Sequence, residues 1–96
     1  MREISELKNE LYEQLLSELP VLRARLGITQ EMLAVKVGCS RQTVNAIEKR
    51  KKALTWQLFM AIIAVFNLDD STRKMLDDIS GLNEKLNMVL KEEIDR

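Results

Sequence analysis

The sequence predicts an all-α fold, and three observations support this prediction. The chain of 96 residues contains one proline and three glycines, and almost none of its segments has the pattern of a strand. Apolar residues recur at steps of three and four, which is the spacing of an amphipathic helix. Residues that favour helix starts precede these stretches. We expect a single domain over 1–96, with a core at 17–80, an N-terminal helical extension at 1–16 and a C-terminal helix at 81–96.

The first helix is predicted from an apolar stripe close to the N-terminus. This stripe consists of Ile4, Leu7, Leu11, Leu15 and Leu19. Pro20 interrupts the pattern, because a proline inside a helix removes a backbone hydrogen bond. Either Ser17 caps a new helix that has Pro20 in its first turn, or one kinked helix continues to Leu26. We favour a break near Ser17.

Two short helices follow, and Gly38 separates them. Gly27 is a natural helix stop, and Thr29 can cap the next helix with its hydroxyl group. Gly38 supplies a left-handed turn residue, a backbone conformation that a side chain would penalise. Ser40 can cap the second short helix in the same way as Thr29. The inward-facing residues are expected to be Met32, Leu33, Val37, Val44 and Ile47.

The rest of the chain predicts three further helices. Thr55 caps the first of them, which covers residues 56–66 and is expected to be the most buried segment. Its inward-facing residues are Leu58, Phe59, Ile62, Ile63 and Phe66. The next helix begins at Asp70 or Ser71, runs to about Ser80 and stops at Gly81. Asn83 caps the last helix, which ends near Asp95.

Positive charge is concentrated in the middle of the chain although the formal net charge is zero. Residues 21–52 carry eight cations and two anions, a balance of +6, whereas residues 1–20 and 53–96 each have a balance of −3. A basic segment between acidic ends is an electrostatic pattern that favours nucleic acid as the partner of the central segment.

The composition also argues against several other classes of protein. The chain has no histidine and one cysteine, so it cannot form an internal disulfide or a Cys/His zinc site. We see no glycine-rich phosphate loop and no pair of nucleophile and base, and we expect no enzyme, no catalytic residue, no metal, no cofactor and no small-molecule site. Without a signal peptide or an apolar run of roughly 18 residues, we expect a cytoplasmic protein with no membrane contact.

The two short helices and the tight turn at Gly38 between them have the spacing of a helix-turn-helix, whose second helix can enter the DNA major groove. Residues 19–66 are also similar to the phage-repressor-like (XRE-type) helix-turn-helix family. The residues that carry this resemblance are Arg23, Gly27, "TQE" at 29–31, Leu33, Ala34, Gly38, "SRQTV" at 40–44 and "IE" at 47–48. The resemblance implies a five-helix repressor-like core that binds double-stranded DNA.

The resemblance assigns the base-reading positions to Arg41, Gln42, Asn45 and Ala46. Arg41 can form two hydrogen bonds with a guanine edge, and Gln42 or Asn45 can do the same with adenine. Ala46 can only contact a thymine methyl group. In the same family, Gln30 binds a DNA phosphate. We expect phosphate contacts from Gln30, Thr29, Ser40, Thr43, Lys49, Arg50, Lys51 and Lys52.

The sequence departs from the family pattern in the loop after the second short helix. Many members have Glu-x-Gly there, whereas this chain has Glu48 followed by Lys49 and Arg50. A left-handed Arg50 would cost about 1 kcal/mol, which leaves open a different closure of the loop. Leu54 stands where a proline often precedes the fourth helix of the family.

We expect a transcriptional regulator that acts as a homodimer on a pseudo-palindromic operator. The last helix has only about a dozen residues and needs apolar cover to be stable. This cover comes either from Ile4, Leu7 and Leu11 of the first helix or from a second subunit, and we favour the second subunit. The expected dimer contacts are Leu82, Leu86, Val89, Leu90 and Ile94. The alternative function is a helical protein-binding adaptor or antitoxin-like module in which DNA binding is secondary or absent.

Overall fold

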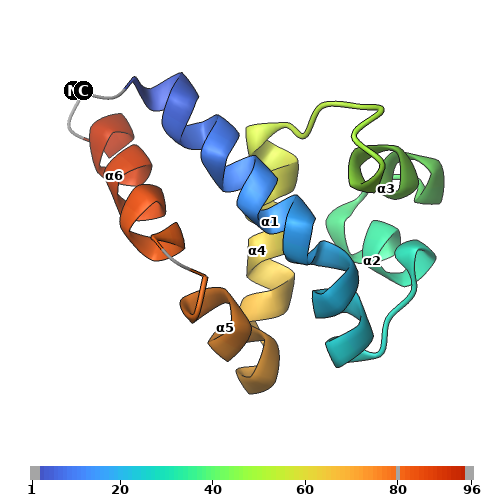
Figure 1. Cartoon of the computed structure of the whole chain (residues 1–96). Helices are drawn as coiled ribbons and strands as arrows, with labels where there is room; N and C mark the ends of the chain where they lie inside the picture. The colour runs from blue at the N-terminus through green and yellow to red at the C-terminus, as the bar shows by residue number, and fades with distance from the viewer. Residues whose placement is uncertain (1–2, 80, 95–96) are drawn as a thin grey trace.

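The computed structural model describes residues 3–79 and 81–94, and these residues form six helices and no strand (Figure 1). The helices are α1 (Ile4–Leu26), α2 (Gln30–Val37), α3 (Arg41–Glu48), α4 (Trp56–Asn67), α5 (Asp70–Asp77) and α6 (Leu82–Ile94). The all-α prediction is confirmed. None of the helices in the described part of the chain is long and apolar enough to cross a membrane.

Helix α1 runs without a break for 23 residues, so the favoured break near Ser17 is wrong. The Ser17 hydroxyl donates a hydrogen bond to the Glu13 carbonyl at 2.8 Å, inside the helix, and does not cap a new one. Pro20 lies within the helix on an exposed position. Continuity of the helix keeps Leu15 and Leu19 in one buried stripe, and this burial offsets the hydrogen bond that Pro20 removes.

The starts of the central helices follow the predicted capping residues. The hydroxyls of Thr29, Ser40 and Thr55 accept hydrogen bonds from the backbone N–H groups three residues later, at 3.1 to 3.2 Å. Gly27 and Gly38 both have left-handed backbones, with φ of 74° and 78°. One expected core residue is wrong: Met32 is 46% exposed, because α2 turns Leu33 and Ala34 inward.

The last two helices differ from the prediction at their ends. Helix α5 begins at Asp70, as expected, and the carboxylate of Asp69 caps it. It ends at Asp77, and Ser80 lies outside the described residues. Helix α6 begins at Leu82 rather than after a cap at Asn83, whose side chain instead donates a hydrogen bond to Asp77 at 2.8 Å. The predicted end at Asp95 also lies outside the described residues.

Helix α6 packs against α1, at the opposite side of the molecule from α3 (Figure 1). Leu82 and Val89 are 1% and 0% exposed and join the same core as Leu7 and Leu11. The chain itself therefore covers two of the expected dimer contacts. Leu86 and Leu90 are half-buried, and the side chain of Ile94 lies outside the described part of the structure.

Replacement of Pro20 by Ala is expected to raise the free energy of unfolding by about 2 kcal/mol. The change restores a backbone donor and a strong helix former, worth about 3 kcal/mol, while up to about 1 kcal/mol is lost because the unfolded chain becomes more flexible. Urea denaturation monitored by circular dichroism measures the difference. Ala24→Gly is a control in the same helix with the opposite expected effect, because glycine in a helix interior should lower the free energy of unfolding. A Pro20→Ala variant that is less stable than the original chain would contradict a continuous α1.

Candidate nucleic-acid interface

The candidate interface is built on α2 and α3, which pack against each other across the turn at Gly38. The backbone N–H of Cys39 closes the end of α2 by donating to the Ala34 carbonyl at 3.0 Å. Ser40 then starts α3, whose buried face contains Val44 and Ile47. This arrangement leaves the opposite face of α3 toward solvent.

The predicted base-reading residues differ in how far they reach solvent. Arg41 and Gln42, in the first turn of α3, are exposed, whereas Asn45 and Ala46 are half-buried. The side-chain oxygen of Asn45 accepts a hydrogen bond from the Gln30 amide at 3.4 Å. Arg41 and Gln42 are therefore the two members of this set that are best placed to contact an external molecule.

Glu48, at the end of α3, joins three helices. Its carboxylate accepts two hydrogen bonds from the Arg23 guanidinium of α1, at 2.8 and 3.0 Å, and one from the Gln30 amide of α2, at 3.1 Å. The side chains of Arg23 and Glu48 are only 17% and 8% exposed. Because bidentate arginine–carboxylate pairs have a fixed geometry, this contact sets the position of α3 relative to α1.

Gln30 was predicted to bind phosphate, but the structure directs its amide group to Glu48 and Asn45. The other polar groups at this position are the backbone N–H groups at the N-terminus of α2. The backbone N–H groups of Gln30 and Glu31 lie in the first turn, where an α-helix offers them no internal partner. The hydroxyls of Ser40 and Thr43 lie 3.0 Å apart and hydrogen bond to each other.

The loop after α3 closes through a left-handed Arg50, with φ of 60°. The helix end resembles one that finishes with glycine, because the Lys51 N–H donates to the Ala46 carbonyl at 2.8 Å. The possibility of a different closure is thus ruled out. The Arg50 side chain helps to hold this conformation, since its Nη1 donates to the Glu48 carbonyl at 2.7 Å.

Arg50 also forms an ion pair with Glu13 of α1, which no pattern in the sequence indicates. The guanidinium donates two hydrogen bonds to this carboxylate, at 2.7 and 3.2 Å, and they lower the pKa of Glu13 from its ordinary value. The two residues are 37 positions apart, and no spacing rule would have joined them. The basic residues of the loop thus separate into Arg50, which is bound within the chain, and the exposed Lys49, Lys51 and Lys52.

Replacement of Arg23 by Met is expected to destabilise the chain by about 3 kcal/mol, because Glu48 keeps its charge in a buried position without its main partner. The Arg23→Met, Glu48→Leu double variant should lose less unfolding free energy than the two single variants lose together, since neither charge is then buried. Chemical denaturation of the four proteins completes the double-mutant cycle. Simple additivity would show that the pair does not couple α1 to α3.

Comparison with known proteins places this helical arrangement in a family. A family model described as helix-turn-helix matches residues 22–71. An uncharacterized HTH-type transcriptional regulator from Archaeoglobus fulgidus is 41% identical over 56 residues, which cover 58% of this chain and 80% of that protein. An uncharacterized HTH-type transcriptional regulator, YgzD, from Bacillus subtilis is 38% identical over 64 residues, which cover 67% of this chain and 88% of that protein. No solved structure gives a significant match. The chain therefore belongs to the XRE-type helix-turn-helix family.

Proposed function

We propose that this protein is a transcriptional regulator that binds double-stranded DNA in a sequence-specific manner, as a homodimer. One observation carries the proposal: the second helix of the helix-turn-helix exposes Arg41 and Gln42 and leads directly into a loop with three exposed lysines. Its relatives in Archaeoglobus fulgidus and Bacillus subtilis are named as transcriptional regulators. Regulation here consists of occupancy of a DNA site.

Base selection is assigned mainly to Arg41 and Gln42. An arginine can form two hydrogen bonds with the O6/N7 edge of guanine, and a glutamine can do the same with the N6/N7 edge of adenine. Asn45 keeps its amide N–H₂ as a donor, because the bond from Gln30 uses only its oxygen. Ala46 has a methyl group alone and is assigned to an apolar contact with thymine.

Phosphate binding is assigned to the N-terminus of α2 and to the lysines of the loop. Backbone N–H groups at a helix N-terminus and the helix dipole together attract anions, which assigns this role to the backbone of Gln30 rather than to its side chain. Lys49, Lys51 and Lys52 add exposed cations in the loop that follows the end of α3. The hydroxyls of Thr29, Ser40 and Thr43 remain secondary candidates, since each already has a bond within the chain.

A homodimer on a pseudo-palindromic operator follows from the small size of one recognition helix. Helix α3 has eight residues and can read only a few base pairs. Two copies that bind half-sites one DNA turn apart, about 34 Å, double the number of contacts and require a two-fold arrangement.

The Lys51→Ala, Lys52→Ala double variant is expected to bind DNA with a weaker salt dependence and an unchanged sequence preference. The plot of log affinity against log salt should flatten by about 1 for each phosphate contact that each subunit loses. Fluorescence anisotropy across a range of salt concentrations measures the slope. The Lys74→Ala, Lys91→Ala variant removes the same charge from α5 and α6 and should keep the original slope. Absence of duplex binding by the unmodified chain at low salt would refute the proposed function and favour the adaptor.

Gln42→Ala and Arg41→Ala are each expected to cost roughly 1–3 kcal/mol on the best site and to relax the preference at one base pair in each half-site. Selection of bound duplexes from a random pool, repeated with each variant, measures both the site and the loss. Arg73→Ala on α5 is the matched control and should select the original sequence. If both variants of α3 keep the original preference and bind uniformly less, these two residues contact only the DNA backbone.

A further inference from the structure

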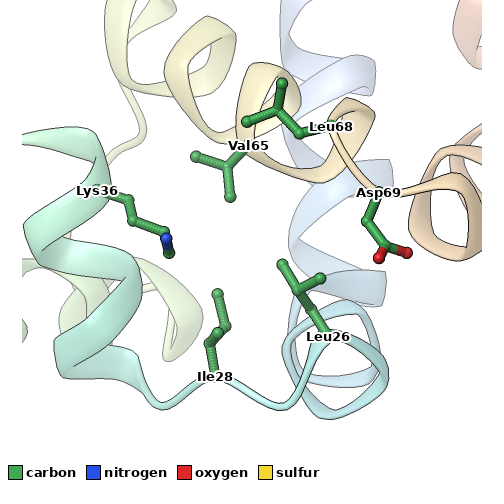
Figure 2. A pocket seen from close by; sticks show the side chains of 6 residues that line it. All are labelled: Leu26, Ile28, Lys36, Val65, Leu68 and Asp69. Atoms are coloured by element: carbon green, nitrogen blue, oxygen red, sulfur yellow. The ribbon is translucent and has the colours of Figure 1, made fainter.

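An apolar hollow lies where the ends of α1, α2 and α4 meet, away from α3 and its loop. Its volume is about 520 Å³, and Figure 2 shows the six side chains around it. We call this the Leu68 surface, and it consists of Leu26, Ile28, Val65 and Leu68, with Lys36 and Asp69 at its edges.

Leu68 is 87% exposed, the largest exposed fraction among the large apolar residues of the described chain. A single exposed leucine is ordinary on a protein surface. This one, however, lies beside a hollow that Val65, Leu26 and Ile28 also line, so the apolar area is contiguous. The exposed side chain of Leu68 and the hollow beside it therefore give another protein a place where apolar atoms can be covered.

The two charged residues make the Leu68 surface complementary to itself. Lys36 and Asp69 lie on opposite sides of the apolar side chains (Figure 2). Asp69 carries the negative charge of an ordinary aspartate at neutral pH, and hydrogen bonds from the Ser71 side chain and from the backbone of Thr72 and Ser71 lower its pKa further. A two-fold axis through the apolar centre would bring Lys36 of each chain to Asp69 of the other.

The position of the Leu68 surface also suits the spacing of two half-sites. Helix α2 contributes Lys36 to it and packs directly against α3. Packed helices are about 8–10 Å apart, so α3 lies within about 20 Å of this surface. Two copies joined there would hold their recognition helices no more than about 40 Å apart, a range that includes the roughly 34 Å of one DNA turn.

The outer face of α6 is less well placed for a dimer that must span two half-sites. It lies across the molecule from α3 (Figure 1). The Cα atoms of the chain extend over 38 × 28 × 20 Å. A two-fold axis on the outer face of α6 would therefore separate the recognition helices by well over one DNA turn. Leu82 and Val89, moreover, are covered by the chain itself.

We propose that the Leu68 surface binds a second copy of this chain and forms the dimer that places two α3 helices on the operator. The inference rests on the proposed function for its spacing argument, while the contact itself depends only on the apolar and charged residues of the surface.

Sedimentation equilibrium of the full chain, with and without duplex DNA, tests this contact. Leu68→Glu is expected to weaken self-association by about tenfold or more, because the buried carboxylate would lose its hydration. Met88→Glu makes the same kind of change at a 52% exposed position on α6 and should leave association unaltered. Circular dichroism should show both variants folded, since both side chains are largely exposed.

A pair of charge variants tests the orientation of the two copies. Lys36→Glu is expected to weaken the dimer, because it would face the acidic Asp69 of the partner subunit. Asp69→Asn removes that charge and keeps a residue that caps helices as well as aspartate does. The Lys36→Glu, Asp69→Asn double variant should therefore associate more strongly than Lys36→Glu alone.

Failure of the dimer surface and failure of the proposed DNA-binding function would give different results. A chain that is monomeric at micromolar concentration both alone and on a two-half-site duplex would overturn the inference, as would dimerisation lost in Met88→Glu and kept in Leu68→Glu. Dimers that depend on Leu68 in a chain that binds no duplex would refute the proposed function and support the dimer surface. Two results together would support both the dimer surface and the proposed function. The Leu68→Glu variant should bind a single half-site with the same affinity as the original chain, and it should lose cooperative binding to the full two-half-site duplex.

Discussion

The carboxylate of Glu48 is the constraint on which the helix-turn-helix depends. It is nearly buried, and a buried carboxylate is costly unless several donors satisfy it. Arg23 from α1 and Gln30 from α2 supply these donors. An error in the placement of either helix would leave a charge without hydrogen bonds, so the three helices have one favourable arrangement. The position of α3, and hence of the side chains offered to DNA, follows from this arrangement.

Local chemistry made much of the fold predictable. Thr29, Ser40 and Thr55 cap their helices with bonds that span three residues, and such short-range signals can be read from the sequence. Pro20 shows where local reasoning fails, because a residue that disfavours a helix interior is tolerated when the leucines around it are buried. For α6 the sequence showed an apolar face that needed cover, but the choice between α1 and a second subunit depended on the tertiary structure.

The candidate site was predicted as a set of residues rather than as a network. The helix-turn-helix pattern identified α2, α3 and the basic loop, but it did not identify which polar groups bind one another. Arg50 illustrates the difference: its charge suggested a phosphate contact, whereas its left-handed backbone and its bonds to Glu13 and Glu48 make it a structural residue. Arg23 is likewise paired with Glu48, so six of the eight cations in residues 21–52 remain outside these two ion pairs.

The continuity of α1 has a consequence for cooperativity. At 1.5 Å per residue, its 23 residues extend for about 34 Å, and along this length the helix packs against α3, α4, α5 and α6. Helix α6 at one end and the Arg23–Glu48 pair near the other are thus attached to the same rigid element. Amide protons in the middle of α1 should exchange with solvent only when the whole chain unfolds, so the C-terminal helix and the helix-turn-helix behave as one folding unit rather than two.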